Sequence, residues 1–149
     1  MIPFIGQLKR YVDKKDVRPG DPVRKFGRTT GLTVGCIFSI CLDIWVYYDR
    51  TGQSAFFQDQ FLIEPALPRH TSFVRKGDSG SVVSTAGQDA VGLIFAGVAD
   101  VPESAKASPN VAAGASDSSA EDGLRRIENY GVANPISEVL ARLKIELPM

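Results

Sequence analysis

The stretch GDSGS at residues 77–81 contains the residue types that a nucleophilic serine requires. A serine hydroxyl that attacks a carbonyl must be exposed on a tight turn, and backbone N–H groups must converge on the oxygen that becomes negatively charged. Gly77 permits a backbone conformation that turns its N–H toward that point, and Gly80 lets the chain leave Ser79 without a side chain that would clash with a substrate. An acid next to the nucleophile cannot act as its base, so we expect Asp78 to accept hydrogen bonds that hold the turn. The pattern predicts acyl-transfer chemistry, and the alternative is a hairpin turn with no chemistry.

A nucleophilic serine needs a general base, which is most often histidine. The chain contains one histidine, His70, in the segment LPRHTSF that precedes the serine stretch. We expect His70 to be a solvent-exposed loop residue. The alternative is a rearranged Ser79–His70 dyad, for which Asp59 or Glu64 could serve as the orienting acid, although nothing in the sequence brings them near His70.

Composition indicates one globular domain with enough apolar residues for a single core: the chain has 149 residues, 44% hydrophobic and 23% charged. Lysine plus arginine equals aspartate plus glutamate at 17 each, which argues against nucleic-acid or membrane-surface binding through bulk charge. The sequence has no apolar run of membrane-spanning length and no secretory leader pattern, so we expect a cytoplasmic protein. No cofactor motif is present, and we expect no cofactor.

The two cysteines, Cys36 and Cys41, are five positions apart on one apolar stretch, which points their side chains to opposite faces of a strand. We therefore expect two free buried thiols without a disulfide. No second cysteine pair or histidine pair accompanies them, so we expect no metal site.

Short segments rich in β-branched and aromatic residues predict a mostly β fold. We expect two strands within 32–48 with a turn or bulge near residues 39–43, and a hairpin turn at 49–53. Residues 44–48 are apolar on both sides, as in the wall of a small barrel or sandwich. The other predicted strands are 22–27, one or two strands within 54–65, 81–85 and 90–97.

One helix is predicted, over residues 134–145. Asn134 can cap it, and Pro135 suits its first turn. The residues Ile136, Val139, Leu140 and Leu143 form an apolar stripe. We expect residues 1–19 to be a linker or N-terminal extension. Residues 100–123 are rich in alanine, serine, proline and glycine and are expected to form a flexible loop, because so few large apolar residues cannot offset the entropy of ordering.

The serine stretch and the strands around it resemble the second barrel of chymotrypsin-like (trypsin-like) serine peptidases. GDSGS, followed by an apolar strand, a turn and AVGLIFAG, is similar to the nucleophile region of that family. Residues 23–37 (VRKFGRTTGLTVGCI) resemble the first hairpin of the second barrel in bacterial members, and residues 133–143 (ANPISEVLARL) resemble the closing segment and C-terminal helix. The pieces occur in the family's order over about residues 20–99 and 131–145. The resemblance implies an antiparallel β-barrel of six or more strands with one C-terminal helix, spanning 20–149.

The resemblance also implies roles for individual residues. Ser79 would be the nucleophile, and the N–H groups of Gly77 and Ser79 would form the oxyanion hole, with Asp78 and Gly80 as supporting residues. Phe73 would lie near the base of the side-chain pocket, where trypsin has an acid, so basic specificity is not implied. The strand that pairs with the substrate backbone would be Phe95, Ala96 and Gly97.

The sequence departs from the family in several places. The family's second glycine after the nucleophile is Ser81 here, and the cysteines that bracket the serine are missing, which fits a reducing compartment. In the family the triad histidine and aspartate come from a first barrel and the segment after it, and the 78 residues before Ser79 leave no room for that barrel.

These departures lead to a specific hypothesis and two alternatives. We expect the nucleophile-bearing lobe of a serine endopeptidase, which acts on peptide or protein substrates, is a poor protease alone, and has the missing N-terminal lobe as its partner. An apolar face left without that lobe makes self-association plausible, and no nucleic acid or membrane is expected as a partner. The first alternative is a non-catalytic peptide-binding or partner-docking module, and the second is a self-sufficient hydrolase that uses His70.

Overall fold

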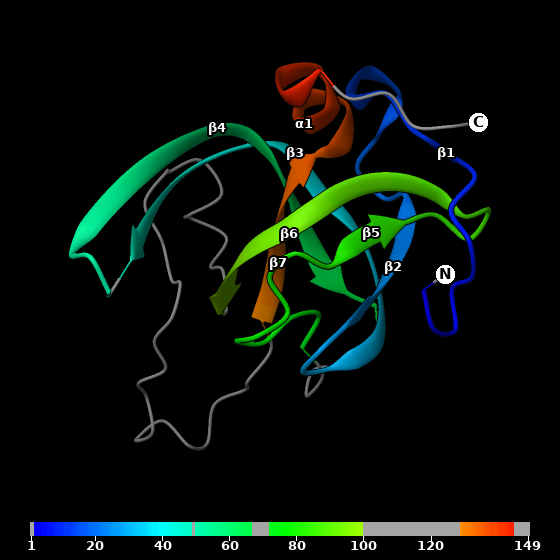
Figure 1. Cartoon of the computed structure of the whole chain (residues 1–149), viewed down its shortest axis with the longest axis horizontal. Helices are drawn as coiled ribbons and strands as arrows, with labels where there is room; N and C mark the ends of the chain where they lie inside the picture. Colours follow the sequence, from blue (N-terminus) through cyan, green and yellow to red (C-terminus); the bar gives the residue numbers. More distant parts are fainter. Residues whose placement is uncertain (1, 49, 67–71, 100–128, 145–149) are drawn as a thin grey trace.

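The computed structural model describes residues 2–48, 50–66, 72–99 and 129–144 (Figure 1). His70 and the predicted loop 100–123 lie outside these residues. The described elements, in chain order, are β1 (Arg10–Tyr11), the 3₁₀ turn η1 (Lys14–Asp16), β2 (Pro22–Gly27), β3 (Gly31–Tyr48), β4 (Gln53–Pro65), β5 (Val82–Ser84), β6 (Asp89–Ala99), β7 (Asn129–Pro135) and α1 (Ile136–Leu143).

Six of the strands close into a ring. Their order is β6-β5-β2-β3-β4-β7. The last strand, β7, also pairs with the first, β6, and this pairing closes the sheet. Every pairing in the ring is antiparallel, and the short β1 is added in parallel to the start of β6. The predicted antiparallel barrel of six or more strands with a C-terminal helix is confirmed.

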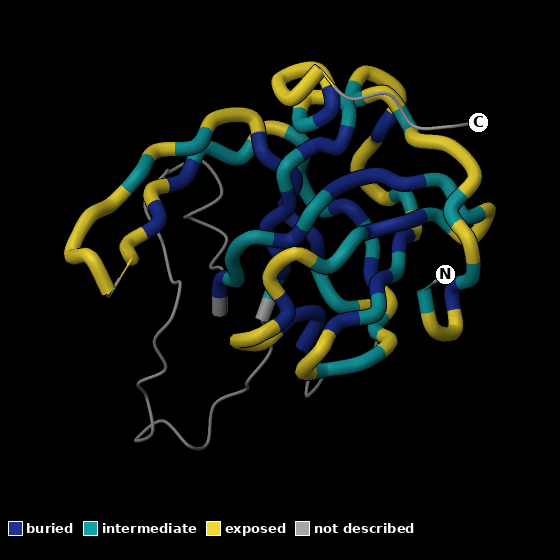
Figure 2. The backbone as a smooth tube through the Cα atoms, viewed as in Figure 1, coloured by how far each residue is buried: buried dark blue, intermediate teal, exposed yellow. Residues whose placement is uncertain are grey.

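Buried side chains that alternate along the strands form two clusters. Figure 2 marks the buried positions along the backbone. The larger cluster includes Phe61, Ile63, Phe73 and Val83, each 0% exposed. The smaller cluster lies where β3, β4, β6 and β7 meet, and its buried members are Ile44, Val46, Leu62, Val98 and Val132.

β3 is one continuous strand, so the prediction of two strands within 32–48 is wrong. The predicted irregularity is present, because the register between β3 and β4 shifts three times between Ile37 and Ile44. Bulges bend a strand without ending it. The bend lets one strand serve first in the barrel wall, beside β2, and then in a long hairpin with β4 (Figure 1).

The N-terminal residues pack against the barrel. The side chains of Ile5 and Val17 are each 3% exposed. The N–H groups of Lys9 and Val12 donate to the carbonyl oxygens of Gln88 and Ala90, each at 2.8 Å. The segment therefore lies along the start of β6.

The helix begins later than predicted, and Asn134 does not cap it. α1 starts at Ile136, and Pro135 occupies the position before the helix without a side-chain capping bond. The Asn134 amide instead donates to Gln60 Oε1 at 2.7 Å. Ile136 and Leu140 pack beneath the helix against Ala90, whereas Leu143, which the apolar stripe also included, is exposed.

Both cysteines are free, but the expectation that they are buried is wrong. Cys41 is exposed, and Cys36 is half-buried with its Sγ donating to Glu64 Oε1 at 3.4 Å. The register shifts that bend β3 fall between these two positions, so strand alternation did not predict their exposure. In the described ranges no group of three or more histidine, cysteine, aspartate or glutamate residues is arranged to hold a metal, and no helix is long and apolar enough to cross a membrane.

Candidate functional site

The serine stretch forms a compact pair of turns between the barrel core and β5. The N–H of Asp78 donates to Arg75 O at 3.0 Å, and the N–H of Ser81 donates to Asp78 O at 3.1 Å. The N–H of Gly80 donates to Ile94 O at 2.8 Å, which ties the stretch to β6. Ser79 is exposed at the outside of these turns.

The side chain of Asp78 points into the protein and is clamped by four hydrogen bonds. Its Oδ1 accepts from the N–H groups of Thr29 and Thr30 at 2.9 and 3.1 Å. Its Oδ2 accepts from the Thr30 hydroxyl at 2.7 Å and from the Arg75 N–H at 2.9 Å. These bonds join the serine stretch to the turn between β2 and β3, so a carboxylate here fixes the conformation on which Ser79 depends.

Lys25 on β2 completes this cluster from inside the barrel wall. Its side chain is 0% exposed, and its Nζ lies 3.8 Å from Asp78 Oδ2. The ammonium also donates to Thr30 Oγ1 at 2.5 Å and to Gly31 O at 3.2 Å. A buried cation is tolerated only with such partners, so Lys25 and Asp78 depend on each other.

The pKa values of the pair follow from these surroundings. Burial would raise the pKa of Asp78, but the hydrogen bonds from Arg75, Thr30 and Thr29 hold it below its ordinary value. Burial lowers the pKa of Lys25, and the charge of Asp78 opposes that shift. The carboxylate is therefore held in its ionised form.

The N–H groups on either side of Asp78 are unpaired. Within the described part of the chain the backbone N–H groups of Gly77 and Ser79 donate no hydrogen bond, whereas those of Asp78, Gly80 and Ser81 do. These two N–H groups are separated by one residue, Asp78, on a clamped turn next to an exposed hydroxyl, and free N–H donors are what an oxyanion site requires.

Both glycines of the stretch have backbone conformations that other residues rarely adopt, with φ of +102° at Gly77 and +93° at Gly80. Gly77 also has no room for a side chain, because a Cβ there would lie 2.2 Å from Thr29 Oγ1. At Gly80 a Cβ would meet nothing within 4 Å. Both positions thus favour glycine because of their φ angle, and Gly77 requires it for lack of space as well.

The predicted substrate-binding residues lie in two different environments. Phe73 is 0% exposed and belongs to the barrel core. Ala96 and Gly97 on β6 pair with Val132 and Gly131 of β7, and Phe95 is at a register shift. β5 pairs with β6 only as far as Leu93, so the other edge of residues 95–97 carries no strand among the described elements.

The described ranges contain no histidine that could act as the general base of Ser79, because the chain's one histidine, His70, lies outside them. Sequence reasoning missed three residues that hold the site, Lys25, Thr29 and Thr30. The sequence pointed to them only through the proposed resemblance of residues 23–37 to the first hairpin of a second barrel. That resemblance implies that the turn RTTG at residues 28–31 lies near the nucleophile.

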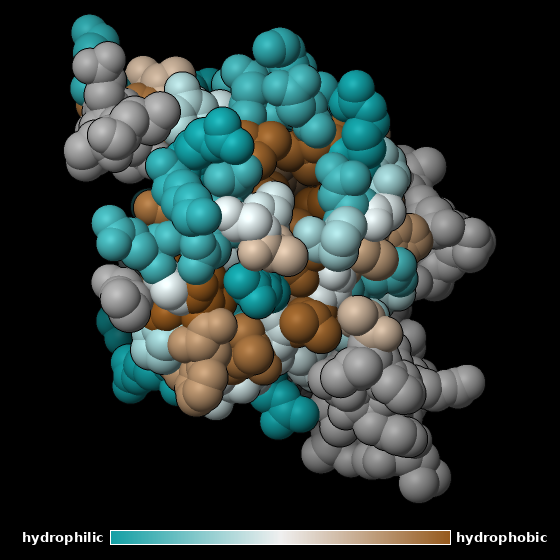
Figure 3. Space-filling model, turned by 90° about the vertical axis from the view of Figure 1, so that its right-hand side faces the viewer, coloured by the Kyte–Doolittle hydropathy of each residue, from teal (hydrophilic) through white to brown (hydrophobic). Residues whose placement is uncertain are grey.

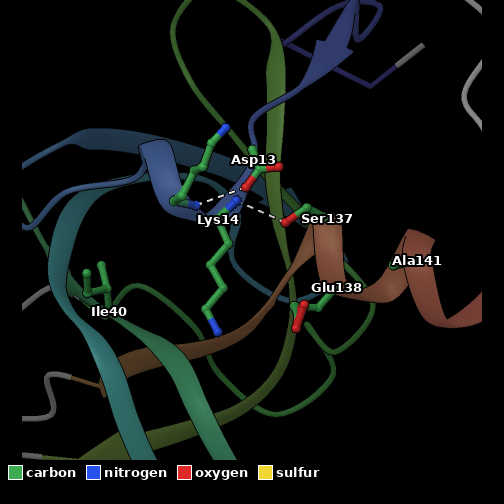
Figure 4. Close-up of a pocket in the computed structure, with 7 residues that line it drawn as sticks. Asp13, Lys14, Ile40, Ser137, Glu138 and Ala141 are labelled. Atoms are coloured by element: carbon green, nitrogen blue, oxygen red, sulfur yellow. Dashed lines mark hydrogen bonds between the residues drawn. The ribbon is translucent and has the colours of Figure 1, made fainter.

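A separate open pocket lies between η1, β3 and α1 (Figure 4). In it the Lys14 N–H donates to Ser137 Oγ at 2.9 Å, and the Lys15 N–H donates to Asp13 Oδ1 at 3.0 Å. Its lining mixes two lysines with two acids and contains no residue of the serine stretch. It does not contribute to the candidate site.

Comparisons with known proteins support the fold. No protein-family model matches the sequence, and no curated protein sequence matches it. Among solved structures, a glutamic-acid-specific serine protease that uses a histidine triad in substrate binding matches 93% of this chain and 52% of its own, with a TM-score of 0.53 and 16% identity. Chymotrypsin of Cellulomonas bogoriensis matches 97% of this chain and 55% of its own, with a TM-score of 0.53 and 17% identity.

The chain therefore spans about half the length of these two serine proteases. Identities this low establish the fold and leave the activity open. With its closed ring of strands and the serine stretch between core and β5, this chain has the fold of a trypsin-like peptidase barrel lobe.

Proposed function

We propose that this chain is the nucleophile-bearing lobe of a serine endopeptidase. Ser79 attacks the peptide carbonyl, the N–H groups of Gly77 and Ser79 stabilise the oxyanion, and Asp78 and Gly80 support the turn. The observation that carries the proposal is the pair of unpaired N–H groups on a turn that Asp78 clamps from inside. The fold and its serine protease neighbours are consistent with this chemistry.

The triad histidine and aspartate belong, in this proposal, to a partner lobe. The chain covers only about half of each neighbour, so in each neighbour a part of about equal length lies outside the match. Without a base, an activated serine loses several orders of magnitude in turnover, and the contribution of the oxyanion site and substrate binding remains. The chain alone is therefore a poor protease.

A peptide-binding module without catalysis is the alternative, and one observation favours it. The edge of β6 at Phe95, Ala96 and Gly97 opposite β7 carries no strand in the described part of the protein, and an extended peptide can pair with such an edge. Binding of this kind needs no oxyanion site. The two proposals therefore differ in whether a negative charge at the carboxyl end of the peptide strengthens binding.

The experiment compares peptide acids with peptide amides. Amide resonances of the ¹⁵N-labelled chain are followed while short peptides are added that differ in their last residue and end either in a carboxylate or in a neutral amide. A peptidase lobe binds the carboxylate form more tightly, with shifts at Gly77 and Ser79, because the acid resembles the cleavage product and its charge lies at the oxyanion site. Equal binding of both forms, with shifts confined to residues 95–97, would instead support the module.

A further inference from the structure

The ends of β3 and β4 leave the barrel as a two-stranded arm. β2 pairs with β3 only as far as Cys36, and β7 pairs with β4 only at Phe61–Ile63. Ile44–Tyr48 and Gln53–Phe57 pair with each other and with no other described strand. Figure 1 shows this arm as a curved ribbon at the left that extends beyond the rest of the sheet, and Figure 2 shows its tip as exposed.

One edge of the arm has the features of a strand edge that can pair with another strand. In an antiparallel pair, alternate residues direct their N–H and C=O groups away from the partner strand, so the outer edge of Gln53–Phe57 presents hydrogen-bonding groups that no described strand pairs with. Proteins usually protect such edges with charged residues or proline. Gln53–Phe57 (QSAFF) contains neither.

The arm also has an aromatic face that the core does not use. Trp45, Tyr47 and Phe56 are 50%, 53% and 41% exposed. The rings of Trp45 and Phe56 contact each other across the two strands with centroids 5.0 Å apart. On the opposite face the alternate residues Ile44 and Val46 are buried at 1% and 2%, whereas Tyr48, nearer the tip, is 41% exposed. The contrast between the two faces therefore holds for Ile44–Tyr47 and ends at the tip of the arm.

We propose that a second copy of this chain binds here, with the two β4 edges pairing antiparallel around a two-fold axis centred near Ala55. The free backbone groups call for a strand, and the pairing would join two aromatic faces into one continuous surface. The formal net charge of the chain is zero, so like-charge repulsion does not oppose contact between copies.

Apolar side chains are scattered on the face of the molecule opposite the arm. On the face shown in Figure 3, opposite the arm, the brown areas that grey atoms leave visible are separated by teal and white ones. A pair of short strands and a few aromatic rings makes a small interface. The dimer is therefore weak and depends on concentration, and this inference does not depend on the proposed peptidase function.

Sedimentation velocity over a range of protein concentrations tests the proposal with two matched variants. Phe56→Lys places a charge on the aromatic face of the arm, and Leu32→Lys makes the same kind of change at a residue that is 43% exposed in the barrel wall. We expect the wild type and Leu32→Lys to approach twice the 16.1 kDa mass of the chain, and Phe56→Lys to need at least about tenfold more protein to do so. Circular dichroism checks that both variants are folded.

A cross-linking measurement tests the register and guards against misfolding of the lysine variant. In a Cys36→Ser/Cys41→Ser background, Ala55→Cys places one thiol per chain near the proposed two-fold axis, and we expect rapid disulfide formation, with Gln88→Cys as a control that stays monomeric. The proposal is overturned if the wild type stays monomeric at all concentrations, if Leu32→Lys alone dissociates the dimer, or if Ala55→Cys forms no more disulfide than the control. A monomer that sediments with phosphatidylcholine vesicles would show that a lipid surface occupies the aromatic face, and would also overturn it.

Discussion

Lys25 and Asp78 form an ion pair, Nζ to Oδ2 at 3.8 Å, between two side chains that are both 0% exposed. One residue belongs to a barrel strand and the other lies beside the candidate nucleophile, so the pair links the barrel wall to the conformation of the serine stretch. Buried ions repay their desolvation only when their partners are in place. The stability of the barrel and the geometry of the candidate site therefore depend on the same contacts.

Replacing Asp78 with asparagine should destabilise the fold strongly. Both carboxylate oxygens accept two hydrogen bonds each, and an amide would turn a donor toward two other donors while leaving Lys25 without a counter-charge. We expect a loss of about 3–5 kcal/mol in the free energy of unfolding, measured by urea denaturation at pH 7. Asp59→Asn, the same change at an exposed residue, should shift it by less than about 0.5 kcal/mol. An Asp78→Asn variant as stable as this control would refute the assigned role.

The cost of Asp78→Asn should shrink in acid. The pKa of Asp78 is lower in the folded protein than in the unfolded chain, where a carboxyl group titrates near about 3.9, so the folded state binds its proton less readily. The stabilisation is therefore fully present above the unfolded pKa and is lost as the pH falls through the folded pKa. Unfolding of the wild type and the variant should be compared from neutral pH down to about pH 2, wherever both remain folded. A difference between them that does not change with pH would contradict the pKa direction.

The two glycines of the serine stretch should respond differently to alanine. At Gly80 the substitution strains only the backbone, and we expect a cost of about 1–3 kcal/mol. At Gly77 the added Cβ also meets Thr29 Oγ1, so the cost should be larger. A double-mutant cycle with Thr29→Ala isolates the clash, and the double variant should be more stable than the sum of the single effects predicts. Strictly additive effects would mean that Thr29 does not restrict this position.

His70 should contribute nothing to the reactivity of Ser79. We expect a fluorophosphonate probe to label Ser79 slowly in this chain and to label His70→Ala at the same rate, because the base that activates the serine belongs to a partner lobe in our proposal. Ser79→Ala sets the background, and Ser81→Ala controls for the neighbouring hydroxyl. Rapid labelling that His70→Ala abolishes would support the self-sufficient hydrolase and overturn the assignment of an incomplete site.

The parts of this fold that could be predicted are those set by local pattern. Period-two alternation predicted most of the strands, and the glycines around Ser79 predicted a tight turn. Lys25 could not be found in this way, because Arg24 and Lys25 are adjacent charges and alternation does not say which faces inward. Asp78, which lies far along the chain, decides that the Lys25 side chain faces inward, because its buried carboxylate pairs with the Lys25 ammonium inside the barrel. The continuity of β3 was missed for a similar reason, since bulges and a pair of strands have the same local composition.

Asn134 provides a test between a local and a non-local role. The sequence predicted a helix cap, whereas in the structure the Asn134 amide donates to Gln60 Oε1 on the neighbouring strand β4. Serine is as good a cap as asparagine but its side chain is too short to replace this bond. We therefore expect Asn134→Ser to reduce the free energy of unfolding by about 1–2 kcal/mol, because the buried Gln60 side chain loses the donor to its Oε1. Gln60→Met should cost a similar amount, and a double-mutant cycle in urea should show coupling between the two residues. If Asn134→Ser leaves the free energy of unfolding unchanged and shows no coupling to Gln60, the side chain of Asn134 acts as a helix cap instead.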